Sequence, residues 1–286
     1  MSTGAPPSLT DRAALARFRA RARRSPDLFL HEDVADEIEE RLTEVNRTFT
    51  APAVVTGFPE IWRKRLPGAR IVADERVLDL EPGAHDLVIH ALALHWADDP
   101  LGQIIQCRRA LRPDGLFIGV MFGGQSLHEL RAVLAQAESE VTGGLSPRVV
   151  PMGEIRDLGA LLQRAGLALP VADAFTRTIL YRDLLHIARD LRAMGEGNAL
   201  ASRHKGPMPR AMIARAQMLY AEAHGDAEGR LPVTVETLFL TGWAPAEGQQ
   251  QPLRPGSAAA RLADALRAVE TALEPAPIAA PRPPKD

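Results

Sequence analysis

Two apolar segments near the middle of the chain are typical of buried parallel strands. Residues 87–94 are almost all apolar, and residues 116–122 form a second apolar run after a Pro-Asp-Gly turn. Strands of a parallel sheet are apolar along their whole length because helices cover both faces. Residues 100–111, between the two runs, predict a helix of the length that connects parallel strands. This order predicts half of an open α/β sheet.

The segments on either side extend the pattern. Apolar residues four positions apart indicate helices, and short apolar runs that end in turns indicate strands. Before residue 87 we expect helices at 11–24, 33–42 and 61–66 and strands at 53–57 and 69–73. After residue 122 we expect helices at 127–141 and 156–165, an alternating strand pair at 174–181 and 233–242, and two helices between that pair, at 183–194 and 209–224. The two inserted helices predict a lid or a docking surface.

These elements divide the chain into a central sheet and its additions. The expected parts are a disordered segment at 1–10, N-terminal helices at 11–50, the core at 51–182, the helical insertion at 183–228, the final strand and C-terminal part of the core at 229–255, and an Ala/Pro-rich tail at 256–286 with one short helix at 258–273.

Composition excludes several classes of partner and site. A net charge of -2 gives no reason to expect nucleic acid, and no apolar run reaches the roughly 20 residues of a membrane-spanning helix. The single cysteine, Cys107, excludes a disulfide framework and is expected to be a buried apolar residue. Only 3 of the 34 basic residues are lysines, which indicates a GC-rich genome, so arginine abundance is not taken as a signal.

The arginine-rich residues 11–24 lack the apolar centre of a secretory signal. A mitochondrial transit peptide has a similar composition, but we favour a mature helix in a cytoplasmic bacterial protein. A solvated basic helix face is favoured over a patch for anionic membranes or acidic partners, and peripheral membrane association stays open.

Several short segments carry a resemblance to a known family. They are Leu-Ala-Leu-His-Trp at 92–96, Arg-Pro-Asp-Gly-Leu-Phe-Ile-Gly at 112–119, Met-Phe-Gly-Gly at 121–124, Met-Gly-Glu-Gly-Asn at 194–198 and Thr-Gly-Trp at 241–243. From about residue 11 to about residue 265 the chain resembles the methyltransferase-fold assembly factor of respiratory complex I, within the class I S-adenosylmethionine (SAM) methyltransferases. It resembles more distantly the biotin-pathway methyltransferase that caps malonyl carrier protein.

The resemblance implies a Rossmann-like class I methyltransferase sheet, SAM as cofactor, and a complex I subunit as protein substrate. In that family the protein is associated with hydroxylation of an arginine.

The sequence departs from the family in the N-terminal part of the core. Thr56 replaces an acidic residue at the end of the first strand, and Pro59 stands at the second glycine of the glycine-rich loop. The second strand is missing, and residues 69–73 match the third. We therefore expect a sheet that lacks one N-terminal parallel strand and carries a two-helix insertion before its last antiparallel strand.

Four residues are candidates for binding SAM. Gly57 follows the first strand, where a missing Cβ lets a cofactor approach the backbone, although an ordinary turn explains it equally well. Asp74 and Glu75 follow a strand, where open α/β sheets bind ligands, and the alternative is two solvated carboxylates. His95 lies at the mouth of the expected cleft, where it can exchange protons near neutral pH.

Five residues are candidates for binding the substrate. Trp96 can pack on adenine or substrate, or simply close the sheet together with His95. Gly123 and Gly124 leave room for a substrate backbone, or form a tight turn. Glu196 and Asn198 belong to the Met-Gly-Glu-Gly-Asn segment and are expected to be exposed beside the cleft, where the alternative is a helix C-cap.

No residue is assigned as catalytic, and no metal site is expected. Hydroxylation requires an oxidant, and His31 with Asp33 has the local spacing of an iron site. Asp33 is, however, expected to cap the helix that begins there. Two functions stay open: a SAM-dependent enzyme acting on a protein side chain, which we favour, and a non-catalytic assembly factor with a degenerate cofactor site. A carrier-protein O-methyltransferase is a further alternative.

Overall fold

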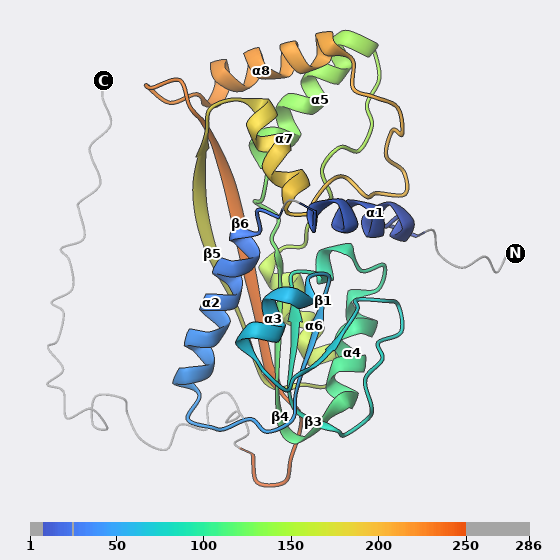
Figure 1. Cartoon of the computed structure of the whole chain (residues 1–286), viewed down its shortest axis with the longest axis vertical. Helices are drawn as coiled ribbons and strands as arrows, with labels where there is room; N and C mark the ends of the chain where they lie inside the picture. Colours follow the sequence, from blue (N-terminus) through green and yellow to red (C-terminus); the bar gives the residue numbers. More distant parts are fainter. Residues whose placement is uncertain (1–7, 25, 250–286) are drawn as a thin grey trace, which may run out of the picture. The chain divides into compact units, whose positions relative to one another are not determined.

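The computed structural model describes residues 8–24 and 26–249. Its centre is a sheet of six strands in the order β2-β1-β3-β4-β6-β5 (Figure 1). The strands from β2 to β4 are parallel, and β6 lies antiparallel between β4 and β5. The strands are β1 (Pro52–Thr56), β2 (Arg70–Val72), β3 (His85–Ala91), β4 (Leu111–Phe122), β5 (Ala168–Tyr181) and β6 (Leu231–Trp243).

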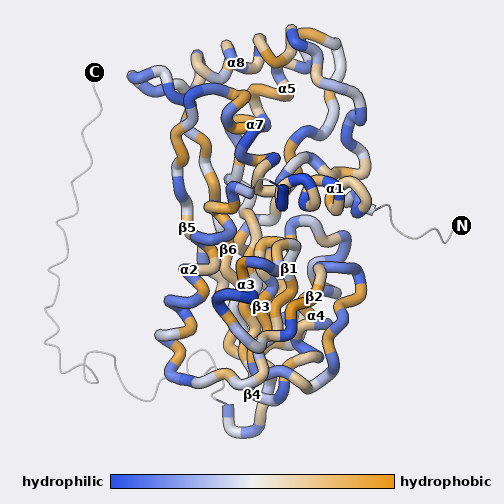
Figure 2. Tube along the Cα trace, in the orientation of Figure 1, coloured by the Kyte–Doolittle hydropathy of each residue, from blue (hydrophilic) through white to orange (hydrophobic). Residues whose placement is uncertain are grey.

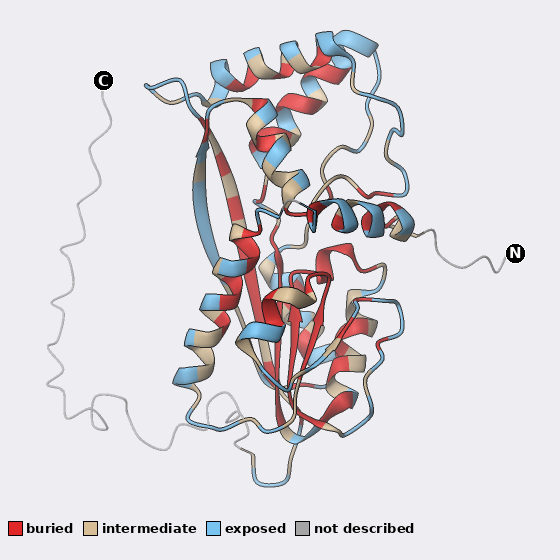
Figure 3. Ribbon diagram, in the orientation of Figure 1, coloured by how far each residue is buried: buried red, intermediate tan, exposed pale blue. Residues whose placement is uncertain are grey.

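Helices cover both faces of this sheet, as the apolar strands predict. Every residue of β3 is buried, so it is the most enclosed strand by sequence and by structure (Figures 2 and 3). Alternate residues belong to different cores: Ile89 packs in one hydrophobic cluster and Val88 in the other. The helices are α1 (Arg12–Ala22), α2 (Phe29–Glu44), α3 (Pro59–Arg65), α4 (Pro100–Ala110), α5 (His128–Thr142), α6 (Ile155–Arg164), α7 (Leu184–Ala193) and α8 (Arg210–His224).

The expected loss of one parallel strand is confirmed within the described residues. β2 pairs directly with β1, with Ala53 opposite Arg70. In a doubly wound sheet the second strand lies beside the first, so β2 takes the place of a second strand even though its sequence matches a third. Asp74 therefore follows the strand next to β1.

The chain leaves β3 earlier than the apolar run suggests. The expected strand reached residue 94, but β3 ends at Ala91 and Leu92 has a positive φ of 45°. A buried 3-10 turn follows at Leu94–Trp96. This turn places His95 and Trp96 at the carboxyl edge of the sheet instead of along the strand.

The two inserted helices, α7 and α8, lie between β5 and β6, as predicted. They share one hydrophobic core with the sheet, because Met212 and Tyr220 of α8 pack in the same cluster as Val133 of α5. The Tyr220 hydroxyl also donates to the carbonyl of Pro232 at 2.8 Å. Figure 1 shows α5, α7 and α8 gathered beyond one end of the sheet.

The N-terminal segment is ordered sooner than expected. Thr10 is buried, forms an isolated bridge with Leu200, and donates from its hydroxyl to the carbonyl of Trp96 at 2.8 Å. The prediction of disorder is therefore wrong for residues 8–10, and its remaining part, 1–7, lies outside the described residues. The tail at 256–286 and its helix at 258–273 lie outside them as well. In the part of the chain that is described, no helix is long and apolar enough to cross a membrane.

Asp86 should be important for stability, because it holds the chain entering β1. Its carboxylate accepts from the backbone N–H groups of Thr50 (2.6 Å) and Ala51 (2.9 Å). Burial alone would raise the pKa of Asp86, but these hydrogen bonds lower it. We expect Asp86→Ala to reduce the free energy of unfolding by about 3 kcal/mol, measured by urea denaturation at neutral pH.

Since the pKa of Asp86 is lower in the folded state, its stabilisation is present above the unfolded pKa of about 3.9 and is lost as the pH falls through the folded pKa. The gap in the free energy of unfolding between the wild type and Asp86→Ala should therefore narrow at pH 3. Asp79→Ala, which removes a carboxylate that is 87% exposed, serves as the control. A gap that widens in acid would contradict this account.

Candidate functional site

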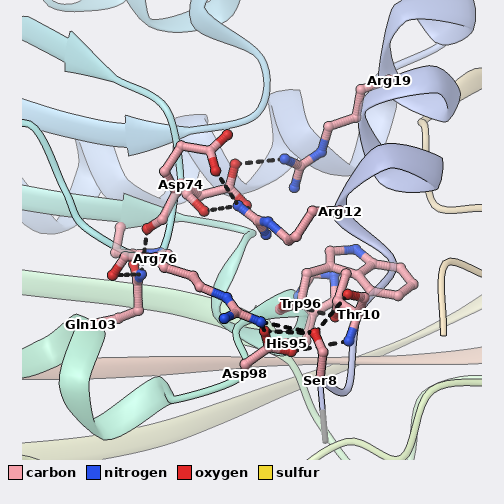
Figure 4. A network of polar contacts seen from close by, with 12 residues as sticks. Ser8, Thr10, Arg12, Arg19, Asp74, Arg76, His95, Trp96, Asp98 and Gln103 are labelled. Carbon is pink, nitrogen blue, oxygen red and sulfur yellow. Dashed lines mark hydrogen bonds and ion pairs between the residues drawn. The ribbon is translucent and has the colours of Figure 1, made fainter. Parts of the chain in front are cut away.

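Helix α1 lies across the carboxyl ends of β1 and β2, where open α/β sheets bind ligands (Figures 1 and 4). Asp11 caps this helix by accepting from the N–H of Ala14 at 2.9 Å, and Ala14, Leu15 and Ala22 bury its inner face. Its polar residues are not all in solvent. Arg19 is buried, so the expectation of a solvated basic face is wrong for this position.

Arg19 and Arg12 both engage Asp74, the first acidic residue after β2. The Arg19 Nη1 lies 2.6 Å from one carboxylate oxygen, and the Arg12 Nη1 lies 3.4 Å from the other (Figure 4). Arg12 also donates to the Asp74 carbonyl. Burial would raise the pKa of Asp74, but the two guanidinium groups lower it. Asp74 is therefore a buried anion, whereas Glu75 beside it is 68% exposed and lies 3.8 Å from the Arg12 Nη2.

Gly57 supplies the close approach that a glycine allows, but the group that approaches is Arg19. A Cβ added at Gly57 would lie 2.5 Å from the Arg19 Cζ, so the Arg19 guanidinium would have to move. Arg23 donates to the Gly57 carbonyl from the same helix. The two expected cofactor residues Gly57 and Asp74 thus meet at one place, and Arg19 joins them.

This arrangement does not fit SAM while α1 stays in place. The first turn after β1 is where the fold receives its cofactor. Here Arg19 covers Gly57, Pro59 has no N–H to offer, and the N–H of Phe58 donates to the Thr56 hydroxyl at 3.1 Å. A cavity of about 310 Å³ lies beside Asp74, with Arg12, Arg76 and Gln103 in its wall.

A second cluster lies at the end of β3. His95, fully buried, packs between the rings of Trp96 and Phe122, with centroids at 5.5 and 5.0 Å. Its Nε2 lies 3.1 Å from one oxygen of Glu196, Oε2, and the Trp96 Nε1 donates to that same oxygen at 2.8 Å. Glu196 comes from the turn after α7, where Gly195 has φ +75°. His95 therefore belongs to this cluster, and the expected position of an exposed Glu196 is wrong, because its side chain is only 6% exposed.

The other Glu196 oxygen, Oε1, is buried and has no hydrogen-bond partner. The Nε2 of His31 lies 3.9 Å from it and is also unpartnered. Burial lowers the pKa of His31 to about 4, against the opposing effect of the Glu196 charge, so this imidazole is neutral at neutral pH. Burial raises the pKa of Glu196, but the surrounding His95, His31 and Arg19 outweigh it, so Glu196 stays ionised.

Sequence reasoning missed His31 and Arg19 as parts of the site. The signal for His31 is its spacing to Asp33, but that spacing indicates a metal pair and not a contact with Glu196. α2 begins at Phe29, so Asp33 is not its cap, and Asp33 pairs with Arg177 instead. For Arg19 the signal is the arginine-rich N-terminal segment, which a GC-rich genome also explains.

An apolar pocket of about 270 Å³ opens beside the Glu196 cluster. Three of the expected substrate residues, Trp96, Glu196 and Asn198, line it. The Asn198 amide is occupied, since it donates to the Pro147 carbonyl at 2.9 Å and accepts from the Leu200 N–H at 3.1 Å. The other lining is mostly aliphatic and aromatic, and includes Leu30, Phe122, Leu130, Leu184, Ile187 and Leu191.

Gly123 and Gly124 do not open space for a substrate. A Cβ at Gly123 would lie 2.2 Å from a Glu236 oxygen, and one at Gly124 would lie 2.3 Å from a Glu154 oxygen. The Gly123 N–H also donates to the Glu236 carbonyl at 2.8 Å. Glutamate side chains pack against both glycines in the turn after β4, so the space expected for a substrate backbone is occupied by the protein itself.

The described residues hold no arrangement of three or more His, Cys, Asp or Glu side chains suited to a metal ion. Cys107 is buried, and burial raises the pKa of its thiol. The arrangement is instead suited to holding a ligand: a buried anion beside an apolar pocket, next to a second buried anion covered by arginines.

Known proteins resemble the chain over most of its length. A family profile described as a methyltransferase domain matches residues 15–119. The chain is 37% identical over 199 residues to "Arginine-hydroxylase NDUFAF5, mitochondrial" of Danio rerio (70% of this chain, 62% of that protein), and 34% identical over 214 residues to the Homo sapiens protein of the same name (75% and 62%). It is 30% identical over 207 residues to "Malonyl-[acyl-carrier protein] O-methyltransferase" of Halorhodospira halophila (71% and 67%). The chain thus spans about three fifths of the arginine-hydroxylase relatives.

Breaking the buried pair of Arg19 and Asp74 should strongly destabilise the protein. We expect Asp74→Ala to lower the free energy of unfolding by about 3 kcal/mol, because it leaves the Arg19 charge buried without its partner. Urea denaturation of the purified protein measures this change.

Removing both charges, in Asp74→Ala combined with Arg19→Leu, should restore most of the loss. Glu75→Ala, the exposed neighbour, should cost little. An equal cost for the Asp74 and Glu75 variants would contradict a large cost for leaving the Arg19 charge buried without a partner.

Proposed function

The chain belongs to the methyltransferase-domain family, and from this premise we propose that it acts on an arginine side chain of a protein partner during assembly of respiratory complex I. The arginine-hydroxylase relatives support the choice of side chain and process. The proposed setting is the bacterial cytoplasm, with the chain associating peripherally with membrane-bound assembly intermediates.

One observation carries the choice of side chain: the apolar pocket with the buried Glu196 carboxylate in its wall. An arginine side chain has an apolar stem and a cationic end, so the two parts match the pocket and the carboxylate. A malonyl group carries a free carboxylate. The ionised Glu196 would repel this carboxylate, whereas Arg148 and Arg192, which line the same pocket, would attract it. The arginine-hydroxylase relatives, at 34% and 37% identity, favour arginine over a malonyl group.

The family implies SAM as cofactor, and two of the expected residues, Gly57 and Asp74, lie together where the fold binds it. The position of Arg19 favours a second candidate function, a non-catalytic assembly factor in which α1 permanently replaces the cofactor. The two candidates differ in one measurable property, the binding of SAM.

We expect SAM to stabilise the protein, with α1 moving away from the cofactor site when SAM binds. At one hundred times its Kd, SAM should raise the free energy of unfolding by about 2.7 kcal/mol, followed as a thermal shift or by calorimetry. Arg19→Ala should bind SAM more tightly, because Gly57 and Asp74 become accessible, and Asp74→Ala should lose the shift. If neither the wild type nor Arg19→Ala responds to millimolar SAM, the non-catalytic function is the correct one.

The role in assembly predicts a loss of complex I in a deletion strain. We expect fewer assembled complexes and, by mass spectrometry of the subunits, a modified arginine that is present in the parent strain and unmodified in the deletion strain. The mass difference also separates methylation from hydroxylation. Normal complex I with an unchanged arginine would contradict the proposed function.

A further inference from the structure

We propose that Glu196 is the residue that recognises the substrate guanidinium, with its Oε1 as the acceptor. This inference rests on the proposed function, because it takes arginine as the target side chain. It assigns to Glu196 the selection of a cationic, hydrogen-bond-donating group.

The second oxygen of Glu196, Oε2, holds the carboxylate in one orientation. Oε2 accepts from the Trp96 indole at 2.8 Å and lies 3.1 Å from the His95 Nε2. Both partners come from the buried 3-10 turn after β3, so the carboxylate is fixed relative to the sheet edge. A pre-oriented acceptor loses little conformational entropy when a ligand binds, which favours recognition.

The other oxygen of Glu196, Oε1, has no donor among the described residues. The His31 Nε2 lies 3.9 Å from it, too far for a hydrogen bond, and neither atom has a hydrogen-bond partner. Buried acceptors without donors cost free energy, so a ligand with several N–H groups recovers that cost on binding. A guanidinium offers five N–H donors in a planar fork, and bonds of this kind to a carboxylate are strong because both groups are charged.

The apolar pocket suits the aliphatic part of the substrate arginine side chain. Its aliphatic lining, including Leu130, Ile187 and Leu191, suits the three methylene groups of an arginine stem. Leu30, the neighbour of His31, and Glu196 itself are in the same wall. A metal ion is disfavoured, since the described part of the chain has no three-ligand cluster.

NMR titration tests the proposal through Trp96 itself, whose indole N–H donates to Glu196. The chain has three tryptophans, so the indole region is simple, and Trp96→Phe assigns the signal. The probe is Nα-acetyl-L-arginine methylamide, and the comparison compound is the citrulline analogue, which has nearly the same shape but no charge. We expect the arginine compound to move the Trp96 signal, and the citrulline compound to bind at least tenfold more weakly.

Glu196→Gln keeps the shape and removes the charge, and should weaken binding of the arginine compound by about ten- to a hundredfold. The matched control is Glu129→Gln, another buried glutamate, which accepts from Thr234 and does not line the pocket. It should bind as the wild type does. The wild-type comparison of arginine with citrulline stands even if Glu196→Gln fails to fold.

Equal binding of the two compounds, no movement of the Trp96 signal, or undiminished binding by a folded Glu196→Gln overturns the proposal. The proposed function is judged separately by the arginine modification in the deletion strain. If that modification is lost on deletion and restored fully by Glu196→Gln, the recognition role is wrong and the function stands.

Discussion

A carboxylate buried at the carboxyl edge of a sheet must have donors, and this constraint organises both parts of the site. Asp74 meets it with guanidinium groups from α1, and Glu196 meets it on one side only, with Trp96 and a ring nitrogen of His95. The Asp74 pair joins the N-terminal helix to the sheet. The Glu196 cluster joins the inserted helices to the same edge, so two segments far apart in sequence are placed by the same kind of interaction.

The difference between these two carboxylates separates stability from function. Asp74 is fully paired, and its charges are compensated within the chain. Glu196 keeps one oxygen unpartnered beside an apolar pocket. A buried acceptor without a donor raises the free energy of the folded protein. A ligand that donates a hydrogen bond to this oxygen would remove that cost, so Glu196 is a good candidate for ligand contact. Arg19, in turn, links α1 to Asp74 and lies against Gly57, in the turn where the fold binds its cofactor.

Much of the fold was predictable. The long apolar runs of β3 and β4 identified a parallel sheet, and the short interval between β1 and β2 identified the missing strand. The ends of elements were less predictable: the apolar run continued past Ala91, and only the positive φ of Leu92 shows where β3 stops. Apolar composition reports burial, and a buried turn is as apolar as a buried strand.

For the site, the sequence alone identified motifs that lie at the carboxyl edge of the sheet: the glycine after β1, the acid after β2, the His-Trp pair and the Met-Gly-Glu turn. It did not determine their partners. Only the tertiary structure placed Arg19 on Gly57, brought Glu196 to Trp96 across 100 positions, set His31 opposite Glu196, and packed carboxylates against Gly123 and Gly124. Spacing along the chain predicts neighbours within one helix or strand, whereas contacts between elements depend on how their buried faces pack.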